Sequence, residues 1–231
     1  MHENETVVMS VGGSLIVPET IDTSFLTHFR ELVEHEVREH NRHFIIIAGG
    51  GRTARNYQEA AASVTKLTSE DLDWLGLHAT RLNGHLLRTI FYDIAHPVIV
   101  TNPDDILDVP KNANVVIAAG YRPGASTDLR SVQIAERIGA TRVANLSNID
   151  YVFTADPKKY PDAEKIEDIT WPEFRKLLPA DWDPGLSSPF DPIAARKAEE
   201  LSLEVAIING NAFKEITHYL NGEIFTGTKI H

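Results

Sequence analysis

Short apolar runs alternate along the chain with longer segments in which apolar residues recur every three or four positions. Thr6–Val11 is the first of the short runs, and His43–Ala48, the second, is almost wholly apolar. Such a run is typical of a strand that is buried on both faces, as in a parallel sheet covered by helices. The same pattern predicts further strands at Pro97–Val100, Asn114–Ala119, Thr141–Leu146 and Glu204–Ile208.

The segments between these runs show helical spacing. In Ile21–His40, apolar residues such as Phe25 and Phe29 recur on one face. A long helix is predicted to begin near Ser69, because Thr68 or Ser69 is a suitable cap and acidic residues follow in the first turn. Further helices are predicted at Ser126–Ile138, Asp191–Leu201 and Ala212–Leu220.

Repeated alternation of strands and helices predicts an α/β fold, a three-layer αβα sandwich with a mostly parallel central sheet. A soft boundary is expected near residue 141, after the helix Ser126–Ile138. The segment Leu178–Pro189, rich in proline and tryptophan, is expected to be the mobile loop.

Composition and charge narrow the classes of function. The chain has 231 residues, no cysteine and a formal net charge of −11. Absence of cysteine excludes disulfides and thiolate chemistry, and a strongly acidic chain is a poor partner for nucleic acid or an anionic membrane. With neither an export signal nor a long apolar run, a cytoplasmic location is expected.

Three glycine-rich segments follow predicted strands, at Gly12–Ser14, Gly49–Arg52 and Gly120–Asp128. The carboxyl ends of parallel strands share one edge of a sheet, where glycine lets the backbone approach a ligand and helix N-termini offer free N–H groups. One such turn is explained equally well by tight strand–helix packing, but three, two of them with arginine, favour an anion site. Neither the P-loop pattern nor the dinucleotide fingerprint occurs.

A histidine-rich segment, His35–His43, resembles a metal-binding motif. His35 and His40 resemble the ends of a zinc motif but have one residue too many between them. At 100° per residue they lie about 140° apart around a helix, so they are not expected to share a metal ion. With His43, they are predicted to form a solvated surface, and no protein metal site is expected.

At the glycine segments the chain resembles the amino acid kinase family, and within it the archaeal-type uridylate (UMP) kinases. The matching pieces are VGGSLIVPE (11–19), AGGGRTARNY (48–57), DWLGLHATRLNG (73–84), AGYRPGASTD (119–128), SNIDYVFTADPKKYP (147–161), SSPFDPIAARKA (187–198) and NGEIFTGTKI (221–230). The order and spacing of seven pieces make the resemblance more specific than any one motif.

The resemblance implies two lobes on one continuous sheet, with UMP bound by residues 1–140 and ATP by residues 141–231. In it, Arg52 and Arg55 hold the acceptor phosphate and Asp73 takes the ribose hydroxyls. The positions matching the UMP site are Gly50, Gly51, Arg52, Arg55, Asp73, Gly76, Thr80, Asn83, Gly120, Ser126, Thr127 and Asp128.

For the ATP site and for phosphoryl transfer the resemblance implies a further set of residues. Gly12, Gly13 and Ser14 would lie under the transferred phosphoryl group, with Arg52 and Asp191 completing the catalytic residues. The positions matching the ATP site are Gly12, Gly13, Asn148, Asp150, Tyr151, Phe153, Asp156 and Pro157. Taken singly, three of the matched aspartates in the two sites are also explained by local structure alone. Asp73 suits the first turns of a helix, Asp191 suits a helix cap, and Asp156 suits a turn with Pro157.

The chemistry agrees with this assignment. A nucleoside monophosphate has a second pKa of about 6, so its attacking oxygen is already ionised and needs no general base. The enzyme must align two polyanions and neutralise their charge. Mg²⁺ is therefore the expected cofactor, bound mainly through ATP.

Three positions depart from the family pattern. Ser10 stands where many members carry lysine, so the compensating cation is expected among Arg52, Arg122, Arg196, Lys158 and Lys159. Tyr151 replaces a glycine beside the nucleotide, which bears on the choice of donor. Arg122 adds a charge to a loop that is often uncharged.

Other functions stay open at this point. The same fold could phosphorylate carbamate, an acylated amino acid or isopentenyl phosphate, although the Gly–Arg segment and Asp73 suit a phosphorylated nucleoside. A non-catalytic protein that binds nucleotides or oxyanions is the alternative that Ser10 and Tyr151 support. By resemblance alone, a homo-oligomer is expected, built as a hexamer.

Overall fold

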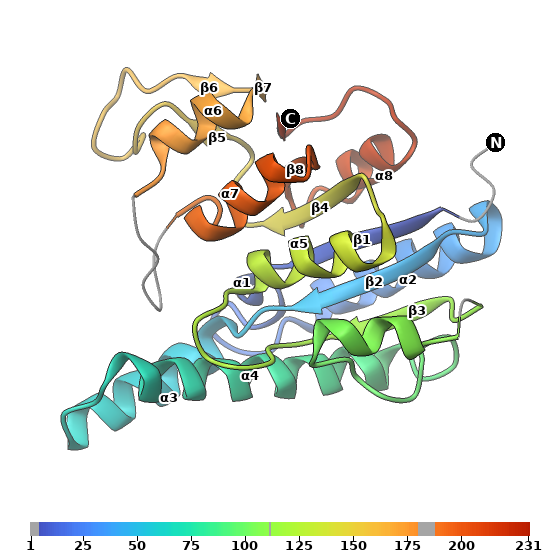
Figure 1. Ribbon diagram of the computed structural model, residues 1–231, viewed down its shortest axis with the longest axis horizontal. Helices are drawn as coiled ribbons and strands as arrows, with labels where there is room; N and C mark the ends of the chain where they lie inside the picture. The colour runs from blue at the N-terminus through green and yellow to red at the C-terminus, as the bar shows by residue number, and fades with distance from the viewer. Residues whose placement is uncertain (1–4, 111, 180–187) are drawn as a thin grey trace.

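A computed structural model describes residues 5–110, 112–179 and 188–231 of the chain. Within these residues, seven strands form one twisted sheet in the order β3-β2-β1-β4-β8-β9-β7 (Figure 1). The strands are β1 (Thr6–Val11), β2 (His43–Ala48), β3 (Val115–Ala118), β4 (Arg142–Ser147), β7 (Asp168–Ile169), β8 (Glu204–Asn209) and β9 (Thr228–Ile230). β5 (Val152–Phe153) and β6 (Lys165–Ile166) form a separate antiparallel hairpin.

The sheet is parallel except for one pairing. β1 lies between β2 and β4 and is parallel to both, and only β9 runs antiparallel to its neighbour β8. Because β1 and β4 pair directly, the sheet is continuous across the expected boundary near residue 141. The carboxyl ends of the central strands therefore lie at one edge, as the sequence predicted.

Helices cover both faces of the sheet, which confirms the predicted αβα sandwich. The first face carries α2 (Thr23–His40), α4 (Ser69–Ile90) and α8 (Phe213–Leu220). The second face carries the 3₁₀ helix η1 (Pro103–Asp108), α5 (Thr127–Ile138), α6 (Trp171–Phe174) and α7 (Pro192–Glu200). The remaining helical segments are α1 (Gly13–Ile16), α3 (Gly51–Val64) and η2 (Arg175–Leu177).

The strand pleat divides the core into two clusters. Val7 and Met9 of β1 point toward the first face and Val8 toward the second, and all three are almost fully buried. This alternation follows from the two-residue period of a strand. Burial on both faces explains why the strands have the near-continuous apolar sequences from which they were predicted.

Several predicted boundaries are confirmed by cap geometry. Thr68 caps α4 in a reciprocal capping box with Asp71, and Ser126 caps α5 by accepting from the Leu129 N–H. Asp191 caps α7, with proline at the first helical position. No helix of the described chain is long and apolar enough to cross a membrane.

Two predictions of elements need correction or fall outside the described residues. Pro97–Val100 is not a strand: its backbone follows β3 but pairs there only through an isolated bridge between Val100 and Ala118. Proline cannot donate to a sheet ladder, which explains the interruption. The predicted mobile loop Leu178–Pro189 lies mainly outside the described residues.

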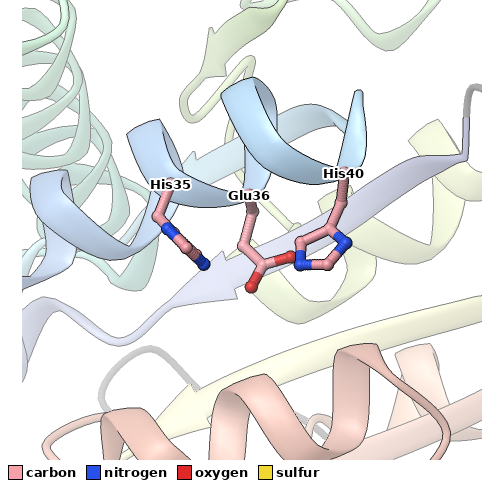
Figure 2. Close-up of side chains that lie close together, drawn as sticks. All are labelled: His35, Glu36 and His40. Carbon is pink, nitrogen blue, oxygen red and sulfur yellow. The ribbon is translucent and has the colours of Figure 1, made fainter.

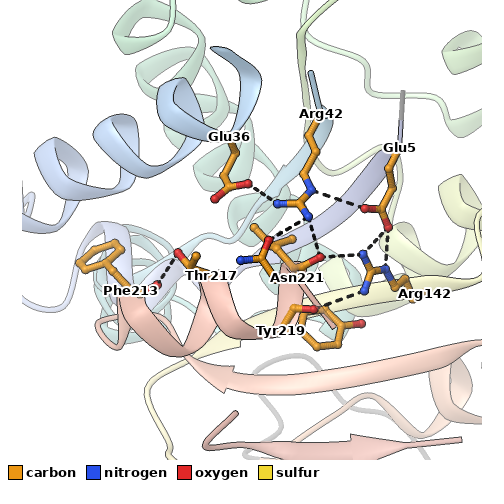
Figure 3. Close-up of polar contacts among 9 residues, drawn as sticks. Glu5, Glu36, Arg42, Arg142, Phe213, Thr217, Tyr219 and Asn221 are labelled. Carbon is orange, nitrogen blue, oxygen red and sulfur yellow. Dashed lines mark hydrogen bonds and ion pairs between the residues drawn. The ribbon is translucent and has the colours of Figure 1, made fainter. Parts of the chain in front are cut away.

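A buried ionic network joins the amino-terminal ends of the central strands to α2 and α8 (Figure 3). Arg42, directly before β2, is paired with Glu36 of α2, which is fully buried. The same guanidinium donates to the Leu220 carbonyl (2.8 Å) at the end of α8. Arg142 of β4 is paired with Glu5, whose other carboxylate oxygen lies 3.5 Å from Arg42 Nε. The network lies at the opposite ends of the strands from the glycine turns.

Replacing Arg42 with alanine is expected to lower the free energy of unfolding by about 3–5 kcal/mol, because it leaves Glu36 buried and unpaired. Adding Glu36→Gln to that variant should restore part of the loss by removing the buried charge. Arg38→Ala, on helix α2 with Glu36, is the control. The Arg38 side chain is 71% exposed, so a loss of at most about 1 kcal/mol in the free energy of unfolding is expected. Denaturant unfolding measures all three, and a cost for Arg42→Ala no larger than that of the control would contradict the role of the network.

Candidate functional site

The backbones that follow β1 and β2 touch one another through glycine. A Cβ atom added to Gly13 would lie 2.6 Å from Gly51 Cα and 2.7 Å from the Gly49 carbonyl carbon. Gly51 has φ +61°, in the left-handed region that favours glycine. Residues with a side chain at these positions would push the two turns apart, so glycine is required for their close approach.

Helix α4 fixes two of the glycine turns through polar side chains. Asn83 donates from its amide to the carbonyls of Gly49 (2.7 Å) and Gly50 (3.1 Å). Thr80 accepts a hydrogen bond from the Gly120 N–H (2.9 Å). Asn83 is 3% exposed, so the structure places it beneath the turn as a support, whereas Thr80 reaches the wall of the cavity described next.

A cavity of about 380 Å³ opens between these turns, and we call it the glycine cavity. This volume is within the range of small-molecule sites, roughly 300–1,000 Å³. Among its lining residues are the predicted positions Gly13, Ser14, Gly50, Gly51, Arg55, Asp73, Gly76, Thr80, Gly120, Ser126, Thr127, Asp128 and Asp191. Segments far apart in the sequence thus converge on one space: the turns after β1, β2 and β3, helix α4 and the start of α7.

Helix starts and one guanidinium make the glycine cavity suitable for an anion. Gly51 begins α3 and Thr127 begins α5, and both residues line the cavity. The first N–H groups of a helix lack intrahelical partners and carry partial positive charge. Of the described residues that line the cavity, Arg55 alone is basic, and it forms no ion pair within the described part of the chain.

Two neighbouring carboxyl groups, those of Asp128 and Asp191, line the glycine cavity. Asp128 accepts hydrogen bonds from the Asp191 N–H (3.1 Å) and from the Asn145 amide (3.0 Å). Asp191 uses Oδ1 to cap α7, while its Oδ2 is buried without a partner among the described residues. Burial, and then the neighbouring Asp191 charge, raise the pKa of Asp128 to about 7. Sequence reasoning missed Asn145, although a polar residue inside a predicted buried strand was a signal.

Asp73 connects the wall of the cavity to the loop after β3. Its Oδ2 accepts from the Gly124 N–H (2.5 Å), and burial raises the pKa of this carboxyl. Arg81, one helical turn past His78, donates to the carbonyls of Gly120 (3.0 Å) and Tyr121 (2.8 Å). The loop is therefore held at two points by α4.

Several predicted cations lie away from the glycine cavity. Arg52 points toward carboxylates, with Glu59 at 3.3 Å and Glu19 at 3.7 Å. Arg122 and Arg196 line a different cavity, on the other side of the α5 start. In this structure Arg55 is therefore the arginine that the glycine segment brings to the site.

Apart from Gly12 and Gly13, which follow β1, the positions matched to an ATP site lie after β4, in and around the β5–β6 hairpin. Asp150 accepts from the Asn209 amide (2.7 Å) at the end of β8. The Lys165 ammonium lies 4.8 Å from the centre of the Tyr151 ring. Asp156 accepts from the Lys158 N–H (3.0 Å) and so forms the predicted turn. Asn148, Asp150, Asp156 and Pro157 are exposed, while Tyr151 and Phe153 are half-buried.

The histidine segment agrees with the prediction in exposure but not in the direction of its side chains. Potential ligand atoms of His35, Glu36 and His40 all lie within 4.8 Å of one another, on one side of α2 (Figure 2). His35 and His40 are exposed, as predicted. Helical spacing did not predict the convergence of the side chains, because it describes Cα positions and not side-chain reach; the prediction that they share no metal ion stays a prediction. His43 is separate, with Nδ1 2.9 Å from the Ala113 carbonyl oxygen.

Comparison with known proteins gives a consistent result. The model of the amino acid kinase family matches residues 5–209. The chain belongs to the amino acid kinase family. It is 32% identical over 225 residues to the uridylate kinase of Methanothermobacter thermautotrophicus, covering 95% of this chain and 97% of that protein. It is 30% identical over 217 residues to the uridylate kinase of Hyperthermus butylicus, covering 94% of each.

Solved structures agree on the fold. The uridylate kinase of Archaeoglobus fulgidus superimposes with a TM-score of 0.82 at 26% identity, covering 97% of this chain and 99% of that one. The aspartate kinase of Synechocystis, at 14% identity, gives a TM-score of 0.74 over 97% of this chain and 39% of the other. The second match shows only that the amino acid kinase fold is shared.

Ser10 stands at the position where the resemblance implied a lysine. It lies in β1, is 2% exposed, and is in register with Ile47 of β2 and Asn145 of β4. A buried position between two strands explains how serine fits there. Positive charge at the glycine cavity must come from elsewhere, and Arg55 is the described side chain in place to provide it.

The Asp128–Asp191 pair gives a prediction about pH. Asp128 has a raised pKa in the folded state, so its stabilising effect is complete below its unfolded pKa of about 3.9 and is lost as pH rises through about 7. Asp128→Asn should therefore stabilise the protein relative to wild type at about pH 8, by on the order of 1 kcal/mol or more, and much less at about pH 5. Denaturant unfolding at both pH values measures this difference. Asp162→Asn, at an exposed position, should leave the wild-type dependence on pH; an Asp128→Asn variant that also leaves it unchanged would contradict the raised pKa.

Proposed function

We propose that this protein is a uridylate kinase, which transfers the γ-phosphoryl group of ATP to UMP and yields ADP and UDP. The observation that carries the proposal is that Arg55 and Asp73 line the same cavity. A guanidinium suits the phosphate of a nucleoside monophosphate, and a carboxylate suits its ribose hydroxyls. Similarity along nearly the whole chain to proteins named uridylate kinase supports the same acceptor.

The acceptor phosphate is proposed to lie at the start of α3. There Gly50 and Gly51 leave room for close approach, and the Arg55 side chain adds a full positive charge. Gly13 and Ser14 line the same space from the β1 side, which is where the two substrates would meet. The backbone is held rigidly by Asn83 and by the glycine contacts, so its N–H groups need little reorganisation during transfer.

Phosphoryl transfer then needs alignment and charge neutralisation more than proton transfer. The acceptor oxygen of UMP is ionised near neutral pH, attacks the γ-phosphorus, and the bond to the ADP oxygen breaks, so that no proton has to move. Mg²⁺ would supply electrostatic stabilisation of the phosphate oxygens, held mainly by ATP. Asp191 fits this arrangement, because its Oδ2 is a buried carboxylate oxygen without a partner among the described residues.

ATP is proposed to bind over the segment after β4, where Asn148, Asp150 and Phe153 lie near the β5–β6 hairpin. Tyr151, under the Lys165 ammonium, occupies the position of a smaller residue in the family pattern and is proposed to influence the choice of donor. We also infer a cytoplasmic setting and a homo-oligomer, with a hexamer as the specific expectation.

A panel of acceptors tests the function directly. ADP release would be measured with UMP, CMP and AMP, and with carbamate, an acylated amino acid and isopentenyl phosphate. UMP is expected to be the best acceptor, and activity should disappear when a chelator removes Mg²⁺. Preference for a non-nucleotide acceptor would contradict the proposal, and no turnover with any acceptor would favour a non-catalytic binding protein.

Arg55→Gln is expected to raise KM for UMP by roughly ten- to a hundredfold, the equivalent of about 1.5–3 kcal/mol for hydrogen bonds to a charged group. Binding of uridine, which lacks the phosphate, should stay unchanged. Arg52→Gln should have the smaller effect, since Arg52 is engaged by Glu59 and Glu19. If uridine binding falls as far as UMP binding, Arg55 does not hold the acceptor phosphate.

Asp73→Asn is expected to weaken UMP binding by about 1–3 kcal/mol and to leave ATP binding unchanged. The amide oxygen can still accept from the Gly124 N–H, so the loop should keep its position. Asp71→Asn is the matched control: it lies in the same helical turn and removes one partner of the Thr68 capping box. Calorimetric titration with each nucleotide measures the split, and equal losses for UMP and ATP would refute the assignment.

A further inference from the structure

Beside the glycine cavity lies a larger one, of about 550 Å³, which we call the arginine cavity. It opens between η1, the loop after β3, α5 and α7. Of the described residues that line it, five are basic (Arg122, Arg130, Arg137, Arg196 and Lys197) and three are acidic (Asp104, Glu136 and Glu200). A local excess of positive charge is notable in a chain with a formal net charge of −11.

Some of these charges neutralise one another at the rim. Arg137 pairs with Asp104 (2.6 Å) and Lys197 pairs with Glu136 (2.6 Å). Arg130, by contrast, forms no ion pair with a carboxylate within the described chain, although it is only 4% exposed. Arg130 is therefore a buried positive charge without an anionic partner among the described residues.

Arg122 and Arg130 lie against the same aromatic ring. Their guanidinium carbons are 5.4 Å and 5.6 Å from the centre of the Tyr121 ring. Arg130 donates from Nη1 to Gln133 (2.8 Å), but its Nε is buried without a partner among the described residues. Burial, and then the charge of Arg122, lower the pKa of Arg130 to about 10. Two cations are thus held close together with no described anion between them.

An unpaired buried guanidinium is costly, and a bound anion would remove that cost. Arginine presents its N–H groups in a planar fork that matches two phosphate oxygens. We propose that the arginine cavity binds the phosphate group of a small phosphorylated ligand, between Arg122 and Arg130. The volume leaves room for an organic body beside the phosphate. The acidic rim disfavours a longer polyanion, because like charges repel.

The two cavities share structural elements. Ser126, Thr127 and Asp128 line the glycine cavity, and Leu129 and Arg130, the next residues of α5, line the arginine cavity. Likewise, Gly120 faces the first and Tyr121 the second. A ligand that changes the conformation of the loop after β3 would consequently alter the shape of both cavities. The proposal itself concerns binding and does not rest on the proposed activity.

Calorimetric titration of the full-length protein at low ionic strength tests the site with two probes, inorganic phosphate and ribose 5-phosphate. Arg122→Gln is the main variant, since Arg122 is exposed and its loss should leave the fold intact. It is expected to weaken binding of the better probe by about tenfold or more, as the loss of a charge-assisted contact does. Arg130→Lys, which keeps the charge but removes the fork, should also weaken binding.

Two controls separate this site from the glycine cavity. Arg55→Gln should retain one phosphate site of wild-type affinity, and Arg38→Gln, a change at an exposed arginine on α2, should change nothing. Tighter binding of ribose 5-phosphate identifies a phosphate monoester as the ligand class, and equal binding identifies free phosphate. The proposal is overturned if neither probe binds wild type at millimolar concentration, or if Arg122→Gln and Arg130→Lys both bind as wild type does. It is also overturned if Arg55→Gln abolishes all binding.

Discussion

The contact between the glycine turns of β1 and β2 is the constraint on which the site depends. Parallel neighbours bring their carboxyl ends to the same edge, but only residues without a Cβ let the Gly13 backbone lie against Gly49 and Gly51. The contact places the start of α3 beside β1, and α4 then fixes it through Asn83. Arg55 and the free N–H groups acquire their positions from this backbone arrangement, so the chemistry of the site is a consequence of how closely two turns pack.

Charged side chains are arranged differently at the two ends of the strands. At the amino-terminal ends of the strands, Arg42 and Arg142 are neutralised by Glu36 and Glu5, and the network joins elements without leaving charge for a ligand (Figure 3). At the carboxyl ends, charge is left unmatched: Arg55 is unpaired within the described chain, and Asp128 and Asp191 are close enough to raise a pKa. An acidic protein that binds anions needs this separation, because its overall field repels them.

Periodicity predicted the long elements that have a buried face, and it missed short ones such as α6 and β9, which are only four and three residues long. The strands β1, β2, β4 and β8 were found because they are apolar on both sides, whereas α3, which has no buried residue, was not predicted. Glycine spacing and family resemblance indicated the positions that converge on the glycine cavity. They could not separate Arg55 from Arg52, because the direction of the Arg52 side chain depends on Glu59 and Glu19. They also did not assign Asn83 a supporting role. Helical spacing also did not predict that the side chains of His35 and His40 converge, since it describes Cα positions and not the reach of side chains.

The central claim is that one cavity holds both ends of UMP, the phosphate at the start of α3 and the ribose at Asp73. A crystal structure of the complex with UMP is its most direct test. The account predicts phosphate oxygens within hydrogen-bond distance of the Gly51 backbone and of the Arg55 guanidinium, and ribose hydroxyls within that distance of the Asp73 carboxylate. UMP bound with its phosphate between Arg122 and Arg130, or with Asp73 still engaged only by Gly124, would contradict it.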